Sequence, residues 1–96
     1  MGMTAHEIAT TAARMAGRCD GVGVMSTPPD DAGILVADED GNRGLLLVSV
    51  PIIGFPILAD GHRQVTLPED EAAWTAARWI DGAELPIKDE KAKNDE

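Results

Sequence analysis

The sequence predicts an α+β fold: an antiparallel meander sheet of about four to five short strands, with an N-terminal and a C-terminal helix, in the order α-β-β-β-β-β-α. Ala-rich amphipathic segments flank the middle of the chain, and short apolar stretches separated by Gly, Pro and Asp fill it. A length of 96 residues suits one hydrophobic core. We therefore expect a single domain over residues 1–87 and a disordered charged tail over residues 88–96.

The first helix is predicted over residues 4–17. Thr4 and Glu7 have the spacing of a capping box, in which each side chain accepts a hydrogen bond from the backbone N–H of the other residue. Gly17 is a natural end for this helix. Helical spacing then places four apolar residues on one face: Ile8, Ala12, Met15 and Ala16.

Five strands are predicted in the middle of the chain, over residues 22–25, 33–38, 43–50, 52–59 and 62–67. Asp40-Gly41 and Asp60-Gly61 each stand between apolar runs and favour hairpins with type I′ turns. Taking Asp40-Gly41 as a two-residue loop fixes the facing pairs, which are Asp38 with Arg43, Val36 with Leu45, Ile34 with Leu47, and Leu35 with Leu46.

Both sides of this first hairpin are apolar, whereas a sheet covered on one face alternates apolar with polar residues. Because the chain offers only two helices, we expect a homodimer or a partner protein to cover the second face. Pro51 and Pro56 cannot donate to a sheet ladder, so the segment between them is predicted to be an edge, a bulge or a bend around Gly54. Three apolar residues are candidates for exposure there: Ile52, Ile53 and Phe55.

The last helix is predicted over residues 68–81, with Pro68 in its first turn and three acids complementing the positive end of the helix dipole. Trp74 points almost opposite to the expected core face, with Arg78 one turn later beside it. The core face itself consists of Ala72, Ala73, Ala76, Ala77, Trp79 and Ile80.

The chain carries a formal charge of -9, and residues 1–87 hold 13 acidic and 5 basic residues. A surface of this sign repels nucleic acid, whose binding depends on Lys and Arg neutralising phosphates, so no direct DNA or RNA binding is expected. It attracts basic proteins instead.

A cytoplasmic location is expected, because the single cysteine, Cys19, excludes an intramolecular disulfide framework and the N-terminus lacks the pattern of a secretory signal. The uncharged run over residues 44–59 is too short for a bilayer and contains two prolines, so no membrane association is expected.

No metal site and no cofactor are predicted. Residues 38–42 resemble the first half of a calcium loop, but Arg43 and Ser49 stand where that loop needs Gly and Glu. The possible zinc ligands lack the short spacing of a metal-binding loop or helix: His6, Cys19 and His62.

No catalytic residue is predicted either. Ser26 and Ser49 lie outside any nucleophile-elbow sequence. An enzyme would require a pocket in which His6 or His62 lies within hydrogen-bonding reach of a carboxylate.

Three acidic clusters and one Trp–Arg pair are the candidate partner-binding residues. On one face, the carboxylates would imitate a row of phosphates and occupy the basic groove of a nucleic-acid-binding protein, whereas a single cluster is usually solvated surface. Trp and Arg are enriched at binding hot spots, although Arg stacked on Trp over the rim of the core is the simpler interpretation. The candidates are Asp30 and Asp31; Asp38, Glu39 and Asp40; Glu69, Asp70 and Glu71; and Trp74 with Arg78.

These features lead to a non-catalytic acidic module that binds or inhibits a basic partner, such as a nucleic-acid-processing complex. Phage DNA mimics such as anti-CRISPR and antirestriction proteins offer an analogy of size and charge, with no shared motif. A second hypothesis is a homodimeric immunity protein or chaperone that binds an effector through the apolar sheet, and a third is a small enzyme of unknown reaction. Salt separates the first two, because screening weakens electrostatic mimicry and leaves apolar contacts intact.

Overall fold

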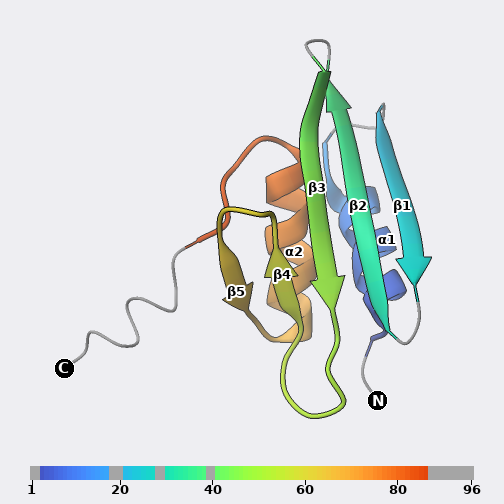
Figure 1. The fold of residues 1–96 in the computed structure, drawn as a ribbon, viewed down its shortest axis with the longest axis vertical. Coiled ribbons are helices and arrows are strands. Elements are labelled where there is room, and N and C mark those ends of the chain that lie inside the picture. Colours follow the sequence, from blue (N-terminus) through green and yellow to red (C-terminus); the bar gives the residue numbers. More distant parts are fainter. Residues whose placement is uncertain (1–2, 18–20, 28–29, 39–40, 87–96) are drawn as a thin grey trace, which may run out of the picture.

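The computed structural model contains a five-stranded antiparallel sheet between two helices in chain order, so the predicted α+β fold is confirmed (Figure 1). It describes residues 3–17, 21–27, 30–38 and 41–86. The strands lie side by side in the order in which they occur along the chain. The elements are α1 (Ala5–Met15), β1 (Val22–Thr27), β2 (Asp31–Asp38), β3 (Gly41–Ser49), β4 (Ile57–Ala59), β5 (Gln64–Thr66) and α2 (Glu69–Ile80).

Both helices lie on the same face of the sheet, side by side and pointing in the same direction (Figure 1). They pack closely because most side chains on their buried faces are alanine, with Ile8 and Ile80 filling the larger spaces. Every residue of the predicted α2 core face is buried, while Met15, expected on the α1 core face, is half exposed at the last residue of the helix. Within the described residues, neither helix is long and apolar enough to cross a bilayer.

Backbone N–H groups at both ends of α1 donate hydrogen bonds to side-chain oxygens. The predicted capping box is confirmed: the Glu7 N–H donates to Thr4 Oγ1 at 3.1 Å and the Thr4 N–H donates to Glu7 Oε1 at 3.0 Å. Other N–H groups beside the helix ends donate to carboxylates from distant parts of the chain, which fixes α1 against β2 and α2. These pairs, each at 2.9 Å, are Met3 with Glu69, Ala5 with Asp30, and Gly17 with Asp81.

The core lies between the helices and the sheet. Alternate residues of the strands point toward the helices and are buried there, as the two-residue period of a strand requires. These side chains, together with the helix faces, form one cluster of buried residues. From the strands it receives Ala32, Ile34, Val36, Leu46, Val48, Leu58 and Val65.

The predicted register of the β2–β3 hairpin is wrong by two residues at the turn and by one beyond it. Asp38 pairs with Gly41 instead of Arg43, so Gly41 belongs to β3 and is not a turn residue; residues 39–40 lie outside the described part of the chain. The register also shifts between Val36 and Ala37, a bulge that Gly44 accommodates with a φ of 142°. Beyond the bulge the pairs are Val36 with Gly44, Leu35 with Leu45, Ile34 with Leu46, and Gly33 with Leu47.

The second hairpin also departs from its prediction. Its loop has four residues, 60–63, and Asp60 does not adopt the positive φ that a type I′ turn requires. Instead the Asp60 carboxylate accepts hydrogen bonds from the backbone N–H groups of His62 and Arg63, both at 2.8 Å. β4 is shorter than predicted, because residues 50–56 form a loop around Gly54, as one of the alternatives for this segment proposed.

The capping box yields a test of the α1 start. Replacing Thr4 with Ala is expected to lower the free energy of unfolding by about 1 kcal/mol, because one N–H group at the helix start loses its acceptor. Urea denaturation of the purified chain measures this loss. Thr10→Ala is the matched control, since it removes only hydrogen bonds to carbonyls of the preceding turn. Equal losses in the two variants would contradict the role of the cap.

Candidate functional site

The sheet face turned away from the helices is uncovered by any described element, and we call it the open face (Figure 1). The strand pairing arranges its residues in three rows across the sheet. The upper row consists of Gly23, Leu35 and Leu45, the middle row of Met25, Gly33, Leu47, Ala59 and Gln64, and the lower row, beside the β3–β4 loop, of Asp31, Ser49, Ile57 and Thr66.

Four large apolar side chains stand at the centre of the open face. Met25 and Leu47 are each 49% exposed, and Leu35 and Leu45 are 40% and 38% exposed. They surround Gly33, where a Cβ atom would lie 3.2 Å from Leu45 Cδ1 and 3.7 Å from Met25 Cγ. The missing side chain therefore lets its neighbours close over the strand and form one continuous apolar patch.

The open face carries little charge where its side chains are described. Among those residues, which exclude 41–43, Asp31 in the lower row is the only charged one, although the whole chain carries -9. Both sides of the β2–β3 hairpin are therefore apolar, as the sequence predicted. The residues that face one another across the hairpin differ from the predicted pairs, because the register differs.

The β3–β4 loop extends the apolar surface beyond the lower row. Ile52 is fully exposed, Ile53 is 87% exposed and Phe55 is 57% exposed, so all three are as accessible as the sequence suggested. A hollow of about 330 Å³ lies between the loop and the sheet, and its lining includes Ile52 from the loop and Asp31 and Ser49 from the lower row. The loop and the lower row thus form one connected surface.

Two of the three acidic clusters lie at one end of the molecule, and Asp38 of the third lies at the other. Residues 30–31 and residues 69–71 both adjoin the start of α1, as the hydrogen bonds of Asp30 and Glu69 demonstrate. Asp38 is at the far end of β2, roughly 23 Å from Asp31 along the strand. Glu39 and Asp40 lie outside the described residues.

The carboxylates near the start of α1, which we call the acidic end, are only partly available to a partner. Asp30 and Glu69 are occupied by backbone N–H groups, and together with Asp31 they are partly buried. Asp70 and Glu71 are exposed at the first turn of α2. The carboxylates that look alike in the sequence therefore differ in the fold: Asp30 and Glu69 bond to backbone at the start of α1, whereas Asp70 and Glu71 differ from them in being exposed.

Trp74 and Arg78 continue the exposed side of α2 beyond the acidic end. Trp74 is 53% exposed, and the Arg78 guanidinium carbon lies 5.0 Å from the centroid of its ring. This stacking matches the simpler interpretation of the pair, and it holds the indole in place while leaving half of its surface open.

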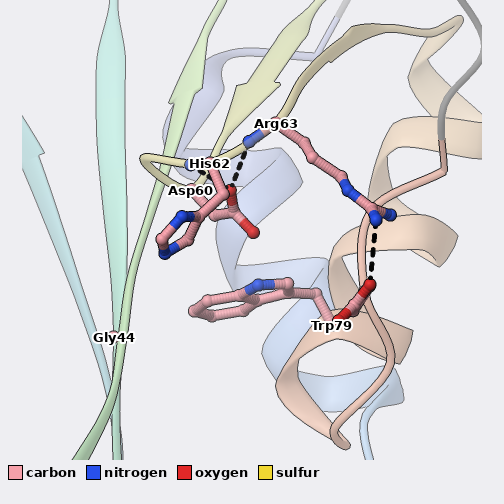
Figure 2. A pocket seen from close by; sticks show the side chains of 6 residues that line it. Gly44, Asp60, His62, Arg63 and Trp79 are labelled. Carbon is pink, nitrogen blue, oxygen red and sulfur yellow. Dashed lines mark hydrogen bonds and ion pairs between the residues drawn. The ribbon is translucent and has the colours of Figure 1, made fainter.

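A pocket of about 400 Å³ lies between the β4–β5 turn and the end of α2 (Figure 2). Trp79 forms its base, and Arg63 reaches across it to Glu84 at 3.1 Å and donates to the Leu85 carbonyl at 2.6 Å. Sequence reasoning did not identify this cluster, whose members come from separate elements. Arg63 thus links the turn to Glu84 and Leu85 of the C-terminal segment, and we call this cluster the clamp.

Asp60 is the titratable group with a shifted pKa in this clamp. Partial burial alone would raise its pKa, but hydrogen bonds from the backbone N–H groups of Arg63 and His62 and with the Trp79 side chain outweigh burial and lower it below its ordinary value of 3.8. The turn therefore favours the charged carboxylate.

The two histidines occupy different surroundings. His6 Nδ1 lies 2.7 Å from Ser26 Oγ on an exposed surface between α1 and β1, a pair that sequence spacing does not indicate. His62 contacts Asp60 through its backbone N–H. Within the described part of the chain, no group of three or more His, Cys, Asp or Glu residues is placed to hold a metal ion.

The clamp predicts a pH-dependent contribution to stability. Because folding lowers the pKa of Asp60, its charge stabilises the fold above a pH of 3.8, and the stabilisation is lost as pH falls through the lower folded-state pKa. Asp60→Asn should therefore destabilise the chain at about pH 6 and much less at about pH 2.5. Urea denaturation at both values measures the difference; a constant difference would contradict this role of the charge.

Comparison with known proteins adds no relative to these observations: no family model, curated protein or solved structure matches the chain. Its function is therefore argued from the open face, the acidic end and the α2 surface alone.

Proposed function

We propose that this chain is a non-catalytic protein-binding module and that the open face is its principal contact surface. The observation that supports this is the group of four large apolar side chains exposed at the centre of the sheet. A sheet with one face in water normally carries polar residues on that face, because exposing apolar side chains to water is unfavourable in free energy. Contiguous exposed apolar surface on a small domain is characteristic of a protein interface.

The energetics favour covering this face. Each Leu or Met side chain moved fully out of water contributes about 1.5–3 kcal/mol, and those of the open face are still 38–49% exposed. Covering the four residues and the adjoining loop would therefore supply several kcal/mol, enough to offset part of the entropy lost on association.

A second surface suits the basic partner that the charge of the chain favours. Asp70 and Glu71 stand exposed beside Trp74, so a charged rim adjoins an aromatic side chain held by Arg78. A Lys- or Arg-rich protein would be attracted by the net charge of -9 and anchored by the indole. Recognition of this kind requires only the carboxylates of the acidic end, and the three acidic clusters do not have to lie on one face. Inhibition would follow if the partner used the same basic groove for nucleic acid.

Capture experiments test the open face. The immobilised chain is incubated with a lysate of the cells that carry it, and any captured protein is identified by mass and then titrated in purified form. Leu47→Asp should weaken binding at least about tenfold, because it places a charge at the centre of the apolar patch. Met15→Asp adds the same charge at an equally exposed side chain at the end of α1, outside both proposed contact surfaces, and should leave this binding unchanged. A partner retained equally by both variants does not use the open face.

The basic partner is tested by salt and by the acidic end. Affinity for a purified basic partner should fall as NaCl rises, and the Trp74→Ala and Asp70→Asn/Glu71→Gln variants should each weaken it by about tenfold or more. Glu84→Gln is the control, because it removes one negative charge from the clamp instead. Salt-independent binding, or equal loss in the control, would contradict the proposed electrostatic recognition.

A further inference from the structure

We propose that the open face binds a second copy of this chain, so that two sheets stack face to face in a symmetric dimer with the helices outside. This inference rests on the proposed use of the open face as a contact surface and names its occupant. The contact centres on Gly33, where Met25, Leu45 and Leu47 close over the backbone.

Self-complementarity is the first argument. In a two-fold dimer the same patch contacts itself, so any charged group near the axis meets a like charge on the other copy. The open-face residues whose side chains the structure describes satisfy this restriction, since among them Asp31 alone is charged and stands in the lower row at the start of β2. The acidic end fails it, because two copies of Asp70 and Glu71 would face each other.

The distribution of charge gives the second argument. Two chains of charge -9 repel each other, and repulsion is weakest where the approaching surfaces carry no charge. The centre of the open face is such a surface, because Met25, Leu35, Leu45 and Leu47 stand there around Gly33. A basic partner would find no carboxylate among these residues, which favours a second copy as the occupant.

The size of the face gives the third argument. Five strands about 4.8 Å apart and three rows of side chains make a flat area of roughly 450 Å² per copy, or about 900 Å² for two copies. The uneven surface of the patch and the adjacent Ile52 raise the buried area toward the lower limit of about 1,000 Å² for a specific interface. We therefore expect a reversible dimer with a dissociation constant in the micromolar range.

The composition agrees with an interface between identical chains. Homodimer interfaces are more apolar than interfaces between proteins that exchange partners, and charged residues are depleted at their centres. The centre of the open face consists of Met25, Leu35, Leu45 and Leu47 around a glycine. Stacking leaves α2 and its Trp74 outside, so each copy would still present its acidic end to a basic partner.

Sedimentation equilibrium of the purified chain tests this dimer at concentrations up to about 500 µM. The expected result is a monomer–dimer equilibrium in which Leu47→Asp raises the dissociation constant at least about 30-fold, because both copies carry the new charge at the centre. Met25→Asp repeats the test on β1 at an equal exposure of 49%. Met15→Asp is the matched control, because Met15 on α1 is also 49% exposed and lies outside both proposed contact surfaces; it should leave the dissociation constant within about twofold of the wild type. Circular dichroism confirms that each variant is folded.

Salt provides an independent readout. Dimerisation should strengthen as NaCl rises, because screening reduces the repulsion between two acidic chains, whereas binding to a basic partner weakens. A wild-type chain that stays monomeric throughout, a dimer that survives both Asp substitutions on the open face, or a dimer that the control disrupts equally would each overturn the inference. If the wild type is monomeric while Leu47→Asp still abolishes capture of a different protein, the proposed function stands and only the second copy is refuted.

Discussion

The position of both helices on one face of the sheet determines the rest of this molecule. Carboxylates from the start of β2 and from α2 accept the N–H groups around the start of α1, and Asp81 accepts one just beyond its end. These bonds fix two alanine-rich helices side by side over a single core. Since the strands are apolar on both sides, this arrangement buries one side and leaves the other to solvent.

The features that sequence reasoning predicted correctly are local ones. A capping box needs only residues 4 and 7, and the core face of α2 follows from helical spacing within 12 residues. The hairpin register failed because it depends on where a bulge forms, and a glycine with positive φ can start a turn or absorb an extra residue. For the same reason, the sequence did not determine which residues lie on the open face, because a one-residue change in register moves each side chain to the other face of the sheet.

The acidic residues illustrate a different limit. A run of carboxylates looks the same in the sequence whether its members face solvent or bind backbone, and the donors here lie 25 and 66 positions away from their acceptors. Asp30 and Glu69 therefore serve the fold, while their neighbours Asp31 and Asp70 make no such long-range bond in the described structure. Part of the negative charge near the start of α1 therefore serves the fold, and a count of acidic residues in the sequence overstates the charge that this region presents to solvent.

Gly33 connects the stability of the sheet to the shape of its surface. A glycine in the middle of a strand costs roughly 0.5–1 kcal/mol relative to alanine, because the unfolded chain has more freedom to lose. A larger residue would have less freedom to lose, but its Cβ would lie 3.2 Å from Leu45 Cδ1 and would force that side chain to move. Engineering this chain for heat resistance by placing valine at Gly33 would therefore displace Leu45 and roughen the open face.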